Sequence, residues 1–362
     1  MLYWLLVPLR EYVSFFNVFR YITVRTAVAG ITALFISFIL GPWFIRMMKK
    51  RQIGQEIRPD GPPSHQIKKG TPSMGGLLII GSTLIPTLLW GNLTNPYVWI
   101  GMITILGFGG IGFWDDYLKV KMRRSLGLKV RTKLLLQFSL AGAVGLALVY
   151  IGMTDGFSLN LSFPFFKKWV PYLGWFYLPW IIFILMGSSN AVNLADGLDG
   201  LAIGLTFISA TALTALTYIA GHINYSNYLN IAYVAQAAEL TVFAGALAGA
   251  CLAFLWFNCH PAQVFMGDVG ALSLGATLAV IAILIKQEFL LFAVAGVFIL
   301  EAASVLLQVG YFRISGGKRI FKMAPLHHHF ELCGWREEQV VVRFWILGVI
   351  FALFSLATLK LR

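Results

Sequence analysis

Apolar stretches separated by short polar connections run the whole length of the chain. Ten of these stretches approach the roughly 17–25 residues that a helix needs to cross a bilayer. They are Ile22–Ile45, Met74–Trp90, Tyr97–Trp114, Leu134–Met153, Tyr172–Met186, Leu201–Ala220, Leu240–Phe257, Val269–Ile285, Phe289–Phe312 and Val340–Leu359. The last two each carry one charge within them, Glu301 and Arg343. The pattern predicts an all-α polytopic membrane protein with about ten transmembrane helices.

Composition supports this class of protein. Of the 362 residues, 58% are hydrophobic and 12% are charged, about half the charged fraction of a soluble domain. We expect one domain, 1–362. Residues 1–21 form a separate N-terminal segment, because Trp4–Tyr21 mixes aromatic side chains with Arg10 and Glu11, which is typical of an interfacial helix. The three cysteines have no paired spacing, so the pattern predicts no disulfide framework and no thiolate metal site.

The distribution of basic residues predicts the topology. A net charge of +13 is compatible with a nucleic-acid partner, but the Lys and Arg side chains are sorted by connection, so we expect no nucleic acid. The first and third connections hold seven each and the ninth holds five, whereas the fifth and seventh hold none. By the positive-inside rule, the odd-numbered connections lie in the cytoplasm and both termini lie in the periplasm. Five cytoplasmic connections therefore carry the candidate chemistry.

Five aspartates fall on the same predicted side, each near the end of an apolar stretch. They are Asp115, Asp116, Asp196, Asp199 and Asp268. Ionisable groups at a membrane edge are costly and are therefore functional candidates. Carboxylates that gather near a phosphate substrate are suited to Mg²⁺. The alternative for the adjacent pair is an interfacial ion pair with Lys119 and Lys121.

A series of carbonyl-bearing side chains lies on the fifth connection. Asn190, Asn193, Asp196 and Asp199 recur at every third residue, which on a helix would place them on one face. The glycines that follow Asp196 and Asp199 favour a break or a tight turn instead. Amides and carboxylates in this pattern suit ribose hydroxyls, phosphates or a hard cation, and helix capping is the structural alternative.

Three further segments bear candidate ligand groups. Phe265 stands shortly before Asp268 and is either an interfacial aromatic or a stacking surface for a base. The consecutive residues His327–His329 follow a basic segment and favour phosphate contact or acid–base chemistry over zinc, because no cysteine accompanies them. In the segment from Lys68 to Gly76, lysines precede a Gly-rich helix start. Such a segment can bind an anion, or its lysines can serve only to set the membrane topology and to contact anionic lipids.

Four of these motifs together resemble one enzyme family. They are DDYLK at Asp115–Lys119, NAVNLADGLDG at Asn190–Gly200, FMGD at Phe265–Asp268 and MAPLHHH at Met323–His329. Over essentially its whole length the chain resembles the phospho-N-acetylmuramoyl-pentapeptide transferases, a branch of the polyprenyl-phosphate N-acetylhexosamine-1-phosphate transferase superfamily. The triple histidine is the feature most specific to this branch. Ala195 and Ser73 depart from the pattern, since threonine is expected at both positions.

The resemblance implies a reaction in peptidoglycan synthesis. Undecaprenyl phosphate would attack the β-phosphate of UDP-MurNAc-pentapeptide to give lipid I and UMP, with Mg²⁺ as the cofactor. The implied location is the bacterial cytoplasmic (inner) membrane, with the active site facing the cytoplasm and membrane lipids around it. The expected assembly is a homodimer.

The resemblance also implies residue roles. The catalytic group is Asp115, Asp116 and Asp268, with Asp268 the leading Mg²⁺ ligand and the other two further candidates. The substrate-binding set is Lys68, Ser73, Asn190, Asn193, Asp196, Asp199, Phe265, Gln308, His327, His328 and His329. A phosphomonoester is mostly dianionic at neutral pH, so a strong general base is not required and Asp115 is expected to position the lipid phosphate. A two-step route through an aspartyl-phosphate stays open. Glu301 is expected to bond to a neighbouring helix.

Two other functions fit parts of the pattern. The first is a sister transferase that uses UDP-GlcNAc, against which the histidine triplet argues. The second is a transporter or flippase, which would place charges along a path near the bilayer midplane. The acids here gather at one membrane edge instead, which favours an interfacial enzyme.

Overall fold

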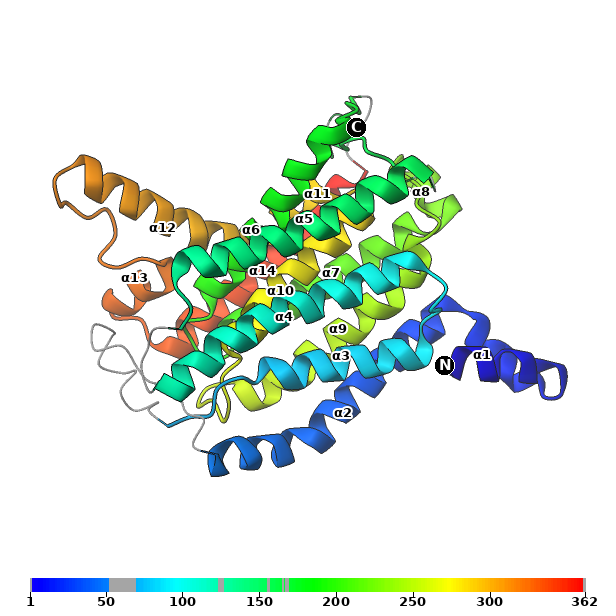
Figure 1. Cartoon of the computed structure of the whole chain (residues 1–362), viewed down its shortest axis with the longest axis horizontal. Helices are drawn as coiled ribbons and strands as arrows, with labels where there is room; N and C mark the ends of the chain where they lie inside the picture. Colours follow the sequence, from blue (N-terminus) through cyan, green and yellow to red (C-terminus); the bar gives the residue numbers. More distant parts are fainter. Residues whose placement is uncertain are drawn as a thin grey trace.

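The computed structural model describes residues 2–51, 70–122, 127–154, 157–164, 166 and 169–360. Within these residues the chain is a bundle of helices (Figure 1), with a single isolated β-bridge and no strand. The described part contains nine helices long and apolar enough to span a membrane, and a shorter apolar helix of 15 residues, Gly76–Trp90. The prediction of an all-α polytopic protein is confirmed.

The helices follow the apolar stretches in order. They are α1 (Leu2–Leu6), α2 (Ile22–Lys50), α3 (Gly76–Trp90), α4 (Pro96–Met122), α5 (Val130–Thr154), α6 (Tyr177–Ala195), α7 (Leu201–Ala220), α8 (Ile223–Leu229), α9 (Ala237–Asn258), α10 (Gly267–Leu284), α11 (Glu288–Val294), α12 (Gly296–Ile314), α13 (Leu326–Leu332) and α14 (Glu337–Thr358). Short 3₁₀ helices lie at Pro8–Glu11, Ser14–Arg20 and Gly174–Phe176.

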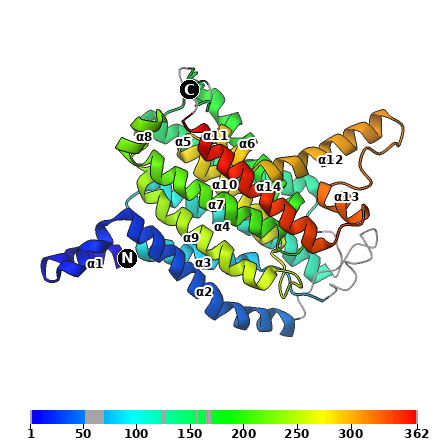
Figure 2. The ribbon, with the colours of Figure 1, turned by 180° about the vertical axis from the view of Figure 1, so that it is seen from behind.

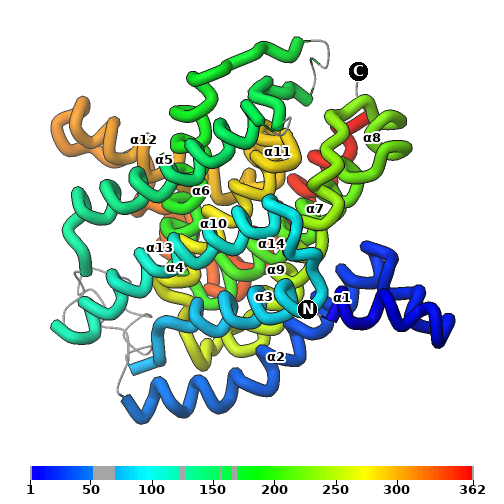
Figure 3. The backbone as a smooth tube through the Cα atoms, turned by 45° about the vertical axis from the view of Figure 1, so that its right-hand side comes forward, coloured from blue at the N-terminus to red at the C-terminus, as the bar shows by residue number. Residues whose placement is uncertain are grey.

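Helix α10 passes through the centre of the bundle (Figure 3). It is apolar on every side and buried along nearly its whole length, which is the pattern of a helix enclosed by other helices. Glycines let two neighbours approach its first turns. A Cβ at Gly112 of α4 would lie 2.2 Å from the carbonyl oxygen of Asp268, and a Cβ at Gly76 of α3 would lie 2.1 Å from the nitrogen of Gly270. This close packing fixes the start of α10 against α3 and α4.

Helices α4 and α6 run farthest past the ends of their apolar stretches, so those predicted boundaries were wrong. The stretch Tyr97–Trp114 belongs to a helix that continues to Met122, which places Asp115 and Asp116 inside α4 rather than beyond its end. The stretch Tyr172–Met186 likewise belongs to α6, which continues to Ala195. Hydropathy falls before each of these two helices ends, because their last turns carry polar side chains that contact other polar side chains within the protein.

The predicted ninth span, Phe289–Phe312, is not one helix. The chain leaves the helical conformation at Ala295, which separates α11 from α12. Next to this break Gly296 packs on the ring of Phe351, where a Cβ would lie 2.8 Å from the ring, so α12 starts in a new direction against α14. Helix α12 then extends away from the bundle (Figure 2) and is the least buried of the spanning helices.

Both chain ends lie at the same end of the bundle, away from α13 (Figure 1). The N-terminal segment projects from that end as α1 and two 3₁₀ helices, none of which contains a buried residue. This exposure fits the predicted interfacial role, and the sidedness of the termini stays a prediction. At the opposite end lie α13 and the polar ends of α4, α6 and α10.

Candidate active site

Three aspartates from two helices meet around one lysine. Asp115 and Asp116 come from the last turns of α4, and Asp268 comes from the first turn of α10. The Nζ of Lys119 lies 2.7 Å from Asp115 Oδ2, 3.2 Å from Asp116 Oδ1 and 3.0 Å from Asp268 Oδ2. The candidate ligand oxygens of the three carboxylates lie within 4.8 Å of one another. The structure therefore brings together the predicted catalytic group.

A second lysine and an asparagine complete this centre. Lys133 of α5 places its Nζ 2.5 Å from Asp268 Oδ2, and Asn193 of α6 donates from Nδ2 to Asp268 Oδ1 at 2.8 Å. The carboxylate of Asp268 thus receives hydrogen bonds on both oxygens from three different helices. Such contacts hold the carboxylate in its charged form and fix its direction.

Backbone groups orient the other two carboxylates. The Leu128 N–H donates to Asp115 Oδ1 at 2.9 Å, and the Val269 N–H donates to Asp116 Oδ2 at 3.2 Å. Gly267 is required beside them, because its φ of +71° is in the left-handed region and a Cβ there would lie 2.5 Å from Asp116 Oδ2. The same Cβ would lie 3.0 Å from the Oγ of Ser73, which places that buried predicted residue at the edge of the centre.

Asp196 lies just after α6, is half-buried and interacts electrostatically with Asp268 and Asp116. Burial, reinforced by the negative charges of Asp268 and Asp116, raises the pKa of Asp196 from 3.8 to about 8. At neutral pH this side chain is therefore mostly protonated. It can donate a hydrogen bond to an anion, and an added cation would favour its ionised form.

A buried glutamate orients the first histidine of the triplet. Glu301 of α12 accepts the backbone N–H of His327 at 3.2 Å and lies 3.0 Å from the ring Nδ1 of the same residue. Both side chains are fully buried. The other ring nitrogen, Nε2, has no hydrogen-bond partner among the described residues, and it faces Gly197, where a Cβ would lie 2.3 Å away. A buried polar atom without a hydrogen-bond partner is a candidate for contact with a ligand.

A second cluster surrounds His260, which the sequence did not single out as a site residue. Its Nδ1 lies 3.1 Å from Asp199 Oδ2 and 3.7 Å from Glu337 Oε2, and these three residues form another group of potential metal ligands. The Glu337 side chain also accepts the Asp199 backbone N–H at 2.9 Å. The sequence signal that could have indicated this cluster is Glu337, an acid at the start of the last spanning helix, on the side where basic residues predominate.

The i, i+3 series on the fifth connection therefore divides, and the break that its glycines predicted is confirmed. Asn190 and Asn193 lie on α6, whereas Asp199 lies in the turn after it. Gly200, with φ of +79°, redirects the chain into α7. Asn193 consequently faces Asp268, and Asp199 faces His260.

Several predicted binding residues have structural partners. Asn190 donates to Gln137 Oε1 and to the Met186 carbonyl oxygen, both at 2.8 Å. Gln308 bonds three backbone groups of Ile320 and Phe321, so it fixes the loop before α13.

The remaining predicted binding residues are His328, His329, Phe265 and Lys68. His328 Nδ1 lies 2.8 Å from Glu331, and His329 Nδ1 accepts the Lys322 backbone N–H. Phe265 is half-buried, and its backbone pairs with Pro72 and Gly75. Lys68 lies outside the described residues.

The chain is similar to known proteins over its full length. Residues 98–286 match the model of glycosyl transferase family 4, and residues 68–80 match phospho-N-acetylmuramoyl-pentapeptide-transferase signature 1. The phospho-N-acetylmuramoyl-pentapeptide-transferases of Thermodesulfovibrio yellowstonii and Desulfotalea psychrophila are each 54% identical, and that of Solibacter usitatus is 52% identical, with 100% of both chains covered in each comparison. The chain belongs to the phospho-N-acetylmuramoyl-pentapeptide-transferase family.

The donor set of the aspartate centre suits the metal expected for a phospho-N-acetylmuramoyl-pentapeptide transferase. Three carboxylates supply hard oxygen ligands, which Mg²⁺ prefers. Three carboxyl groups face two ammonium groups, so ionisation of all three would leave the centre with a net negative charge. Glycines at positions 127 and 267 keep Cβ atoms away from these oxygens. The second cluster includes an imidazole and is a less suitable site for Mg²⁺.

Proposed function

We propose that the protein transfers phospho-N-acetylmuramoyl-pentapeptide from UDP-MurNAc-pentapeptide to undecaprenyl phosphate, forming lipid I and UMP. The observation that carries this proposal is the convergence of Asp115, Asp116 and Asp268 on Lys119, with Lys133 beside them. Facing carboxylates and ammonium groups at the end of a spanning bundle suit the meeting of a lipid phosphate with a soluble diphosphate. The names of the full-length relatives favour this substrate over UDP-GlcNAc.

The reaction exchanges one phosphorus–oxygen bond for another. An oxygen of the lipid phosphate bonds to the β-phosphorus, and the bond from that phosphorus to the bridging oxygen breaks, leaving the electron pair on UMP. The lipid phosphate is already mostly dianionic at neutral pH, so it requires no strong base. Lys119 and Lys133 would stabilise phosphate charge, while Asp115 and Asp116 would fix the position of Lys119.

Asp268 is the proposed first ligand of Mg²⁺, with Asp115 and Asp116 completing the acidic set. When bound, the ion would neutralise diphosphate charge and favour departure of UMP. His327, through its unpartnered Nε2, would contact the sugar or diphosphate. Asp196, Asp199 and Phe265 would hold the uridine part, and Lys68, Ser73 and His328 would contribute to the phosphate end.

Release of UMP tests the reaction and its two alternatives. Purified protein is incubated with undecaprenyl phosphate, Mg²⁺ and either UDP-MurNAc-pentapeptide or UDP-GlcNAc. We expect UMP with the first nucleotide sugar only. Release with UDP-GlcNAc alone would establish the sister activity. Lipid translocation in sealed vesicles without UMP would instead support a flippase. Phosphorylated enzyme trapped in the absence of the lipid would support the two-step route.

The proposed location is the bacterial cytoplasmic membrane, with the site facing the cytoplasm. Two natural cysteines test this orientation, because Cys259 and Cys333 are exposed in the predicted cytoplasmic connections while Cys251 is buried. A membrane-impermeant maleimide should label them in inside-out vesicles and not in intact spheroplasts. The variant with Cys259→Ser and Cys333→Ser is the control. Labelling of spheroplasts would reverse the orientation.

The proposed assembly is a homodimer. Light scattering of the purified protein in detergent, with the detergent mass subtracted, measures the number of chains in the particle. Twice the chain mass of 40.2 kDa is expected, and a particle with a single chain would contradict this proposal without affecting the reaction.

A further inference from the structure

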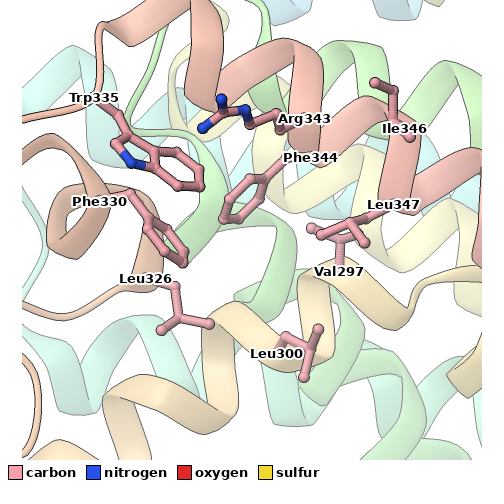
Figure 4. A pocket seen from close by; sticks show the side chains of 9 residues that line it. All are labelled: Val297, Leu300, Leu326, Phe330, Trp335, Arg343, Phe344, Ile346 and Leu347. Atoms are coloured by element: carbon pink, nitrogen blue, oxygen red, sulfur yellow. The ribbon is translucent and has the colours of Figure 1, made fainter. Parts of the chain in front are cut away.

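A cavity of about 450 Å³ lies between α12, α13 and α14, apart from the aspartate centre. Its lining residues are Val297, Leu300, Leu326, Phe330, Trp335, Arg343, Phe344, Ile346 and Leu347 (Figure 4). The volume is within the roughly 300–1,000 Å³ range of ligand-binding pockets. All the lining side chains are apolar or aromatic except one, which is an arginine.

Arg343 is the unusual member of this lining. It is exposed and lies six residues after Glu337, about 9 Å along the spanning helix α14. Its guanidinium lies 4.0 Å from the centre of the Trp335 ring. Among the described residues no carboxylate pairs with it. An arginine near the end of a membrane helix extends its charged group toward the headgroup level, where an anionic group can pair with it.

Aromatic rings build one wall of the cavity beneath this cation. Trp335 stacks on Phe330 with ring centres 4.5 Å apart, and Phe330 meets Phe344 edge-on at 6.0 Å. The other wall is aliphatic and includes Leu300 and Leu347, which are 43% and 41% exposed. In a membrane these exposed side chains face lipid, so the cavity opens toward acyl chains and carries a positive charge at its edge.

We propose that this cavity binds an anionic diacyl phospholipid of the surrounding bilayer. One acyl chain occupies the apolar cavity, and the phosphate of the headgroup pairs with Arg343. Guanidinium groups form strong, often bidentate hydrogen bonds with phosphate, and Trp335 is the type of residue that lies at the headgroup level. The site is independent of the proposed transferase reaction.

The position of the cavity relative to α12 separates the proposed phospholipid site from a site for the polyprenyl substrate. A smaller cavity of about 190 Å³ lies between α6 and α12, and it reaches Ala191, next to Asn190 of the aspartate side. Its α12 residues, such as Phe298 and Ala302, are on the opposite face of the helix from Val297 and Leu300. The larger cavity is also separated from His327 by the body of α13, since Leu326 and Phe330 point into it while His327 is fully buried.

Lipid binding to purified protein tests the site, with phosphatidylglycerol as the probe. Delipidated protein in detergent is titrated with this lipid, and bound molecules are counted by native mass spectrometry. Arg343→Gln removes the cation and Leu347→Trp fills the cavity. The matched controls are Arg313→Gln, which removes a charge at the end of α12, and Leu353→Trp, which adds the same ring at an exposed position farther along α14.

Each cavity variant should lose one tightly bound phosphatidylglycerol, and Arg343→Gln should weaken that site about tenfold or more, as expected for loss of a charge-assisted hydrogen bond. The controls should bind like the parent protein. The proposal is overturned if both cavity variants retain every bound phosphatidylglycerol. It is also overturned if undecaprenyl phosphate displaces the lipid from the parent and Arg343→Gln abolishes binding of that substrate.

Discussion

Glu301 holds His327 by two contacts, one to its backbone N–H at 3.2 Å and one to its ring Nδ1 at 3.0 Å. A carboxylate can only accept hydrogen bonds, so the ring proton lies on Nδ1 when the imidazole is neutral. The unpartnered Nε2 is then an acceptor directed at the turn after α6. A single buried acid thus sets both the direction and the tautomer of a candidate substrate-binding histidine.

Replacement of Glu301 by Gln should lower kcat for UMP release by about 10- to 100-fold, the range for removing a partner that orients a functional histidine. The amide can donate to Nδ1, which moves the ring proton to Nε2 and turns that atom from an acceptor into a donor. The kinetic split between kcat and KM, with the Tm as a check on folding, measures this effect. Glu301→Asp should recover part of the rate.

Ser304→Ala provides the matched control for Glu301→Gln. Ser304 is buried in the same helix and donates to the backbone oxygen of Glu301 without touching His327. We expect the parent rate from this variant. Full activity of Glu301→Gln at unchanged KM would show that the contact is structural only.

Substitutions in the two candidate groups of metal ligands, the aspartate centre and the His260 cluster, should affect Mg²⁺ affinity differently. Asp268→Asn should weaken the apparent Mg²⁺ affinity in the UMP assay by more than the roughly 10–100-fold that loss of an outer-shell partner costs. Glu337→Gln removes a carboxylate from the His260 cluster and should leave that affinity near the parent value. Mg²⁺ titrations of activity, repeated as Mn²⁺ binding followed by electron paramagnetic resonance, measure both. The reverse ranking would place the ion at His260.

The raised pKa of Asp196 makes the folded protein more stable in acid. Because the carboxyl binds a proton more tightly folded than unfolded, its contribution to stability is full below the ordinary pKa of 3.8 and is lost as the pH rises through about 8. In buffer with a chelator, the Tm of the parent protein should therefore fall more between about pH 5 and about pH 8.5 than the Tm of Asp196→Asn. Glu11→Gln, at an exposed acid, should keep the parent slope. Equal slopes for all three proteins would contradict the assignment.

Two glycines of α4 provide a matched test of the close contact between α4 and α10. Gly112→Ala would place a Cβ 2.2 Å from the Asp268 carbonyl oxygen, whereas a Cβ at Gly110 meets no described atom within 4 Å. We expect Gly112→Ala to lower the free energy of unfolding by about 1–3 kcal/mol, as overpacking does. It should also reduce activity, because the start of α10 must move.

Gly110→Ala should raise the free energy of unfolding by about 0.5–1 kcal/mol, since alanine replaces glycine within a helix. Denaturation in mixed detergent, followed by far-ultraviolet circular dichroism, compares the two variants. Equal effects at both positions would mean that α4 does not contact α10 as described.

The apolar pattern was a good guide where a helix is enclosed by lipid or by other apolar helices. The stretch Leu201–Ala220 coincides with α7 at both ends, and the charge distribution had already assigned Asp115, Asp116 and Asp268 to one side. The pattern failed where a helix carries polar residues toward the site, as in the last turns of α4 and α6. It also failed at Ala295, since Phe289–Phe312 is apolar on both sides of the break.

The sequence by itself determined the class of protein, the order of its apolar segments and the residue types of the centre, because hydropathy and charge are properties of each residue and its neighbours in the chain. Only the tertiary structure decided which of those residues meet. Asp268 contacts Lys133 and Asn193, Asp199 contacts His260, and Glu301 contacts His327. These contacts form because close packing at glycines and turns of the chain bring distant helices together. Such contacts depend on how several helices pack at once, and hydropathy along one helix does not record them.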